Sequence, residues 1–150
     1  MLITRTLAVA SLFLAVACSR RPTSDTESTA VAANSAQLRS TYWKLTALGD
    51  KPVIVAESQR EPHIILNPDS KQVNGSGGCN RMFGSYELNG DALTFSGIGS
   101  TKMACTDGMD IEGSFLPALS RVAKWQITGS QLELRDATGA VIARFDAKAK

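Results

Sequence analysis

The side chains with reactive chemistry are few in this sequence: three cysteines and a single histidine, His63. Cys79 and Cys105 could form a disulfide, which would close a loop of about 25 residues and stabilise the fold by roughly 3–4 kcal/mol. A zinc site needs four ligands, and the chain has no Cys-x-x-Cys and no second histidine. A nucleophilic thiol would have to stay reduced and lie beside His63. The disulfide is the favoured interpretation, and two inert thiols are the remaining alternative.

The third cysteine, Cys18, follows a segment with the features of an export signal. Residues 1–5 carry a positive charge, and residues 6–16 form a nearly unbroken apolar run. At about eleven residues the run is too short to span a bilayer, which needs roughly 20, but it suits a signal peptide. Small residues, Ala15 and Ala17, precede Cys18. The sequence therefore predicts a signal peptide over residues 1–17.

A cysteine at this place resembles the lipobox of bacterial lipoproteins, in which the thiol receives a diacylglycerol and becomes the mature N-terminus. Ala15 departs from that motif, which usually has leucine there. Ser19 resembles the residue found in lipoproteins sorted to the outer membrane, so we expect a membrane-anchored protein in the cell envelope that faces the periplasm. Ordinary secretion after Ala17 is the alternative, and it would leave Cys18 as an odd exposed thiol.

The composition separates a tether from a folded domain. Residues 18–40 hold the lipid-attachment cysteine and a Ser-, Thr- and Ala-rich segment without aromatic residues, which predicts a flexible tether with a reach of roughly 25 Å. Residues 41–147 predict one domain, expected to be a monomer. The formal net charge of +2 is too balanced for a nucleic-acid-binding protein.

Residues 75–105 contain a cluster of glycines followed by Cys79, Asn80 and Arg81. The amide and guanidinium could bind a carboxylate or phosphate of a ligand. In the structural alternative, which we favour, Asn80 ties the loop backbone and Arg81 pairs with a carboxylate such as Glu87 or Glu112. The glycines lack the Lys-Ser/Thr ending of a phosphate-binding loop, and no hydrolase or metalloprotease motif is present, so no enzyme activity, cofactor or metal is expected. The expected binding or structural network comprises Asn80, Arg81, Tyr86, Thr101 and Lys102.

Alternation of polar and apolar residues predicts short strands joined by tight turns. The expected strands are 42–48, 63–66, 72–75, 86–88, 93–95, 125–128, 131–134 and 141–145. Asn89-Gly90 is the pair preferred in a type I′ hairpin turn between the fourth and fifth of them. Large aromatic side chains are expected in the core: Trp43, Phe95, Phe115 and Trp125.

From Asp107 the apolar period changes to that of a helix. Asp107 or Asp110 is expected to cap its start, and Pro117 to kink the helix or delay its start. The predicted fold class is α+β, a small curved antiparallel sheet or half-barrel of about seven or eight strands packed on one helix. The apolar stripe that faces the sheet consists of Ile111, Phe115, Leu119 and Val122.

Several short motifs, spread from Trp43 to Phe145, closely resemble the META domain (HslJ-like) family. The resemblance implies a small antiparallel half-barrel packed on a helix, links to envelope and stress phenotypes, and no known catalytic activity. It leaves the partner open: either an unknown protein, or an apolar, lipid-like ligand held within the half-barrel. The motifs are Trp43-x-Leu45, Pro62-His63-Ile64, Gly75-Ser76-Gly77-Gly78-Cys79-Asn80-Arg81, Gly84-Ser85-Tyr86, Leu93-x-Phe95, Ser100-Thr101-Lys102-Met103-Ala104-Cys105, Glu112-x-x-Phe115-Leu116-x-x-Leu119 and Leu132-x-Leu134.

Overall fold

A computed structural model describes residues 37–148. The expected signal peptide, the expected acylation site Cys18 and most of the expected tether lie outside the described residues. Within residues 37–148, no helix has the length and apolar character needed to cross a membrane.

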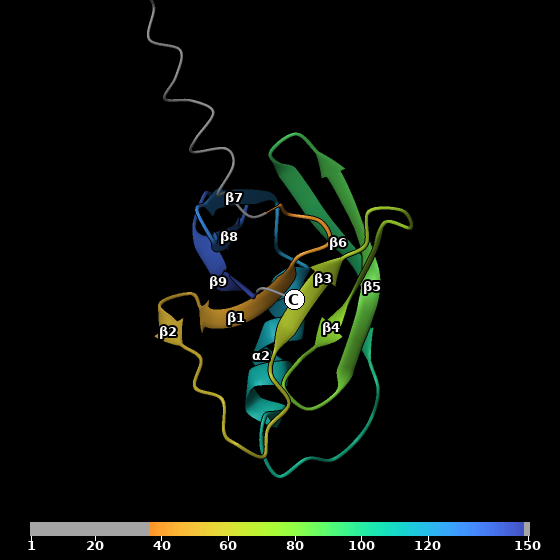
Figure 1. Cartoon of the computed structure of the whole chain (residues 1–150), viewed down its shortest axis with the longest axis vertical. Helices are drawn as coiled ribbons and strands as arrows, with labels where there is room; N and C mark the ends of the chain where they lie inside the picture. The colour runs from red at the N-terminus through yellow and green to blue at the C-terminus, as the bar shows by residue number, and fades with distance from the viewer. Residues whose placement is uncertain (1–36, 149–150) are drawn as a thin grey trace, which may run out of the picture.

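The described part of the chain forms nine strands and one helix (Figure 1). Every predicted strand is present, most of them longer than expected, and β2 is an additional short strand that was not predicted. The elements are β1 Tyr42–Leu48, β2 Lys51–Pro52, β3 His63–Leu66, β4 Gln72–Ser76, β5 Arg81–Asn89, β6 Ala92–Ser100, α2 Met109–Leu119, β7 Lys124–Thr128, β8 Gln131–Arg135 and β9 Val141–Lys148.

The strands form a single antiparallel sheet in the order β2-β1-β3-β4-β5-β6-β7-β8-β9. β1 also pairs along its length with β9, which curves the sheet around a central core (Figure 1). In contrast, β6 and β7 share a single residue pair, Ala92 with Lys124, so the two strands separate beyond it. The fold is thus α+β, a curved half-barrel with one helix, as predicted.

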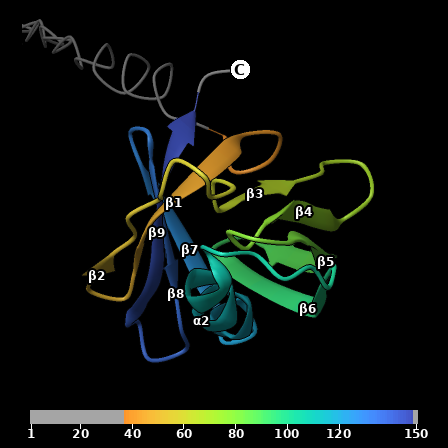
Figure 2. The ribbon, with the colours of Figure 1, turned by 90° about the horizontal axis from the view of Figure 1, so that it is seen from below.

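The helix packs on the concave side of the sheet against β6 and β9 (Figure 2). Phe115 and Leu119 of the predicted apolar stripe are fully buried, and the Phe115 ring lies 5.9 Å from that of Phe145. The interior is filled by large side chains with less than 2 % exposure, so an apolar core holds the half-barrel together. The largest of them are Trp43, Phe115, Phe145, Leu45, Ile64 and Leu66.

The start of the helix differs from the prediction. Gly108, with φ of 88°, is the N-cap residue, and no side chain caps the helix. Asp107 instead accepts a hydrogen bond from Ser58, at 2.7 Å. The helix begins at Met109 and continues through Pro117, so the expected late start is wrong. Pro117 lies in the last turn, where it removes the one hydrogen bond that its N–H would have donated to the Gly113 carbonyl.

The hairpin between β5 and β6 also differs from the predicted type I′ turn. Asn89 pairs with Ala92, which leaves Gly90 and Asp91 as the turn residues, and only Gly90 has a positive φ. Trp125 holds this shifted turn. Its indole N–H donates to the Gly90 carbonyl at 3.0 Å, and its backbone N–H donates to the Asp91 carbonyl at 3.1 Å.

The folded domain begins earlier than the predicted boundary at residue 41. Leu38 is 6 % exposed, and its carbonyl accepts a hydrogen bond from the Trp43 indole at 2.8 Å. Arg39 forms a parallel bridge with Leu66. The composition of residues 18–40 does not predict this earlier start, because one apolar side chain, Leu38, is enough to fix the segment onto the core.

Candidate functional site

Cys79 and Cys105 form a disulfide, with their Cα atoms 5.8 Å apart. Cys79 is 3 % exposed, whereas Cys105 is partly exposed. Because both sulfurs are in the bond, neither is available as a nucleophile in this state. The predicted disulfide is confirmed, and it fixes the segment after β6 to the start of β5.

Glu112 on α2 is a buried carboxylate bound by Asn80 at both oxygens. It is 8 % exposed. Its Oε2 accepts the backbone N–H of Asn80 at 2.6 Å, and its Oε1 accepts the Asn80 side-chain amide at 2.9 Å. The Ser100 hydroxyl donates to Oε1 at 3.4 Å. A single carboxylate therefore connects the helix to the beginning of β5 and the end of β6.

The other end of the Asn80 side chain holds the segment that follows β6. Its Oδ1 accepts the Thr101 hydroxyl at 2.9 Å and the Met103 backbone N–H at 2.8 Å. The Asn80 amide also donates to the Met103 carbonyl at 3.2 Å. The prediction that Asn80 ties the loop backbone is confirmed. We call Asn80, Glu112, Thr101 and the Cys79–Cys105 disulfide the polar node.

The glycines beside the polar node are required by close packing. A Cβ on Gly77 would lie 2.6 Å from the Cγ of Glu112. At Gly108, which has a positive φ, a Cβ would lie 2.5 Å from the carbonyl oxygen of Gly78. The glycine cluster thus permits the helix start and the segment before β5 to approach each other.

Arg81 does not pair with either carboxylate named in the prediction. Glu112 is bound by Asn80, and Glu87 forms an ion pair with Lys71 at 3.0 Å. The Arg81 side chain is exposed, and within residues 37–148 it has no ion-pair partner. The predicted pairing is wrong because side chains alternate along β5. The Arg81 side chain faces solvent, whereas Glu112 of α2 is buried on the other side of the strand.

The remaining predicted network residues do not gather at the polar node. Tyr86 is buried in the middle of β5, where its hydroxyl donates to the Asn67 carbonyl at 2.7 Å. Lys102 is exposed beside Thr101. Sequence reasoning missed the role of Glu112, although its position three residues before the buried Phe115 is a signal for a carboxylate near the apolar stripe.

Arg81→Ala should leave the melting midpoint within a few degrees of the wild-type value. The physical reason is that removal of an exposed, unpaired guanidinium costs at most about 0.5 kcal/mol. Thermal unfolding followed by circular dichroism measures this. A loss of 10 °C would contradict the exposed position of Arg81.

A second polar cluster lies at the start of β1 and β3. The rings of Tyr42 and His63 stack 4.2 Å apart, and the His63 Nδ1 lies 2.9 Å from the Glu61 carbonyl. That oxygen can only accept, so Nδ1 carries the proton. The Glu61 carboxylate accepts hydrogen bonds from Tyr42 at 3.1 Å and Lys148 at 2.8 Å, and pairs with Lys44 at 3.1 Å.

The environment of this cluster shifts the pKa values of three groups. Burial lowers the pKa of His63, and the nearby Glu61 opposes the effect only in part. Burial and the hydrogen bond to Glu61 raise the pKa of Tyr42 to about 12. Burial alone would raise the pKa of Glu61, but hydrogen bonds from Lys148, Lys44 and Tyr42 together lower it. His63 is therefore neutral and Tyr42 protonated at neutral pH.

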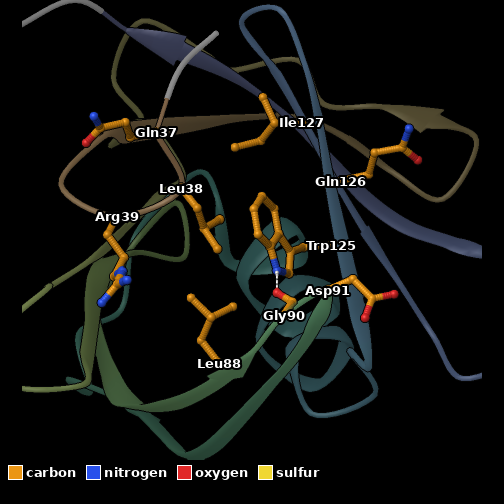
Figure 3. A pocket seen from close by; sticks show the side chains of 9 residues that line it. All are labelled: Gln37, Leu38, Arg39, Leu88, Gly90, Asp91, Trp125, Gln126 and Ile127. Atoms are coloured by element: carbon orange, nitrogen blue, oxygen red, sulfur yellow. Dashed lines mark hydrogen bonds between the residues drawn. The ribbon is translucent and has the colours of Figure 1, made fainter. Parts of the chain in front are cut away.

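A surface groove of about 650 Å³ lies between β7, the β5–β6 hairpin and the segment before β1 (Figure 3). We call it the β6–β7 groove. Trp125, predicted to be a core residue, is only half-buried and forms one of its walls. Figure 3 shows the other walls, from the segment before β1 and from the β5–β6 hairpin. They include Leu38, Arg39, Leu88 and Asp91, whereas Ile127, like Trp125, comes from β7.

No group of three or more histidine, cysteine, aspartate or glutamate side chains gathers as a metal site within residues 37–148. The polar node has hydrogen bonds at both Asn80 side-chain atoms and both Glu112 oxygens. Its geometry therefore fixes backbone segments, and the grooves are the places where a ligand or partner can lie.

Comparison with known proteins agrees with this fold. An NMR structure of a protein from Burkholderia xenovorans is 26% identical, with a TM-score of 0.62 over 87% of this chain and 99% of that chain. A second NMR structure is 25% identical, with a TM-score of 0.57 over 73% of this chain and 91% of that chain. No curated protein matches the chain significantly. The family model of the META domain matches residues 36–149, and the chain therefore belongs to the META domain family.

Proposed function

We propose that this protein is a lipoprotein of the cell envelope, anchored through Cys18 in the outer membrane and facing the periplasm. Its META domain has a docking role and no catalytic activity, in support of envelope integrity under stress. The apolar run before Cys18 supports export, and a disulfide suits an oxidising compartment. The observation that carries the docking role is the β6–β7 groove beside an unpaired strand edge.

The unpaired edge belongs to β7. Thr128 pairs with Gln131 across a two-residue turn, so the backbone groups of Thr128 face β8 and those of Ile127 face the other side. Trp125 lies two residues before Ile127, so its backbone groups face the same side. Its backbone N–H accordingly donates a hydrogen bond to the Asp91 carbonyl and not to β8. Because β6 pairs with β7 only at Lys124, the N–H and C=O of Ile127 have no backbone partner among the described residues.

The occupant that fits this edge is an extended segment of a partner protein. Such a segment adds one strand to an exposed sheet edge through main-chain hydrogen bonds, and pockets along the edge select its side chains. The β6–β7 groove supplies apolar surface for those side chains from Leu88, Trp125 and Ile127. The short length of the edge predicts a transient rather than a permanent complex.

Binding of an apolar ligand is the second candidate. The interior of the half-barrel is filled by side chains such as Trp43 and Phe145, which are not exposed at all. An apolar molecule would therefore lie in the β6–β7 groove instead of the interior. A native mass spectrum of protein extracted from envelopes distinguishes the two candidates, because a retained small ligand adds a defined mass.

Cys18→Ser should release the protein from membranes or block its maturation, because serine has no thiol to accept the diacylglycerol. Cell fractionation and labelling with a fatty-acid analogue measure this. Cys79→Ser is the matched control. Because Cys79 is in the disulfide, its substitution should leave the fatty-acid labelling unchanged. If the wild type is not labelled, the anchor is refuted.

Ile127→Pro should abolish partner capture, whereas Ile127→Val should preserve it. Proline removes the N–H that an added strand requires, and this N–H has no partner within residues 37–148. A photo-crosslinking residue at position 88 captures whatever lies in the groove, and mass spectrometry identifies the crosslinked peptide. Equal capture of the same peptide by both variants would refute strand addition at β7.

A further inference from the structure

A second hollow, of about 360 Å³, lies on the outer face of the sheet over β1, β3 and β4. We call it the cationic hollow. The stacked Tyr42 and His63 form one part of its lining, Asn74 of β4 forms another, and Arg60 and Arg81 are also among the lining residues. It is separate from the β6–β7 groove, with which it shares no lining residue.

The charges around the cationic hollow do not balance. Glu61 is its only carboxylate among the described lining residues, and that carboxylate is already bound by Lys44, Lys148 and Tyr42. Arg60 and Arg81 are both exposed, and neither has a carboxylate within ion-pair distance among residues 37–148. Asp107 lies in a neighbouring hollow with Arg60 but bonds to Ser58.

Two unpaired guanidiniums at one hollow favour an anion with several acceptor oxygens. A guanidinium presents its N–H groups as a planar fork that matches phosphate and carboxylate. Asn74 adds an exposed amide that can donate further hydrogen bonds. His63 does not add a charge, because burial lowers its pKa.

We propose that the cationic hollow binds the phosphate of an anionic lipid headgroup at the membrane surface, with Arg60 and Arg81 as its ligands. The lipid source rests on the proposed anchoring through Cys18. Tyr42 and Lys148 pair at the ends of β1 and β9, so this hollow lies close to the N-terminal start of the domain. A tether of the 18 residues between Cys18 and Gln37 is short enough for this face to reach the membrane.

The choice of a headgroup over an acidic protein follows from the shape and position of the site. The hollow is small and discrete, whereas an acidic protein partner would need a broad surface. An anionic membrane also attracts each nearby cation with about 1 kcal/mol, and Lys44 and Lys148, which both pair with Glu61 of the lining, add two further cations near the hollow.

Vesicle sedimentation tests the proposal. The probe is the chain from residue 18 onward with Cys18→Ser, which lacks both the expected signal peptide and the acyl acceptor, mixed with phosphatidylcholine vesicles with or without phosphatidylglycerol. We expect binding only when phosphatidylglycerol is present. Arg60→Ala and Arg81→Ala should each weaken it about fivefold, and the double variant roughly 25-fold. Arg121→Ala with Lys124→Ala, which removes the same charge outside the hollow, should change binding by no more than about twofold.

Three results would overturn the headgroup site. The first is equal loss of binding in the arginine pair and in the charge-matched control, which would indicate attraction by net charge alone. The second is no preference for phosphatidylglycerol. The third is stronger competition by an acidic peptide than by soluble short-chain phosphatidylglycerol, which would assign the hollow to a protein. The probe carries no lipid anchor, so vesicle sedimentation and the labelling of Cys18 are independent tests. Either experiment can give a negative result without changing the outcome of the other.

Discussion

Glu112→Gln should lower the unfolding free energy by roughly 3 kcal/mol and the melting midpoint by about 10–20 °C. The two Glu112 oxygens accept one backbone N–H and one amide N–H of Asn80. Glutamine keeps the size of the side chain but replaces one acceptor oxygen with a donor. One Asn80 donor then faces another donor inside a buried site, and each unsatisfied group costs about 1–3 kcal/mol.

Asn80 cannot relieve this clash by turning its amide. Its Oδ1 already accepts hydrogen bonds from Thr101 and the Met103 backbone, and a rotated amide would present donors to both. The backbone N–H of Asn80 has no freedom to turn at all. Glu87→Gln is the matched control, because Glu87 is exposed and bound only to Lys71, and its loss should cost less than about 1 kcal/mol. Equal melting midpoints for the two variants would show that the polar node does not stabilise the fold.

Most strands and the helix could be predicted because their apolar periods are strong. In β1, Trp43 and Leu45 are buried while Tyr42 and Lys44 alternate with them, which is the pattern from which the strand was predicted. Phe115 and Leu119 likewise fall on the buried face of α2. Period alone, however, does not set a turn: the β5–β6 turn shifted by one residue because Trp125, from a distant strand, bonds to Gly90 and Asp91.

The candidate site was predicted only in part, for a similar reason. The disulfide and the tie made by Asn80 follow from residue types close in sequence to the glycine cluster. The partner of Asn80, Glu112, lies on another element, and only the folded sheet decides that it faces Asn80 and not Arg81. The half-buried state of Trp125 was also unpredictable, because it depends on the separation of β6 from β7.

Removal of the disulfide is the second large effect that we expect. Cys79 and Cys105 are separated by 26 positions, and the bond restricts the unfolded chain over the loop they enclose. In the chain-entropy model a loop of this length corresponds to roughly 3.5 kcal/mol. The variant with both Cys79→Ala and Cys105→Ala should therefore melt at least 10 °C below the wild type. Without the bond, the segment after β6 is held to the start of β5 chiefly by Asn80 and Thr101.

A reductant separates the effect of the disulfide from that of the substitutions. Both proteins carry Cys18→Ser, so that the disulfide cysteines are the only thiols that can be titrated. Reduction should lower the melting midpoint of the chain that retains Cys79 and Cys105 to nearly that of the double alanine variant, and should not change the variant itself. Cys79 is buried, so its truncation also removes some packing, and the variant should remain slightly less stable than the reduced chain. Two free thiols in protein purified from the periplasm, or a reductant that leaves the midpoint unchanged, would contradict a stabilising disulfide.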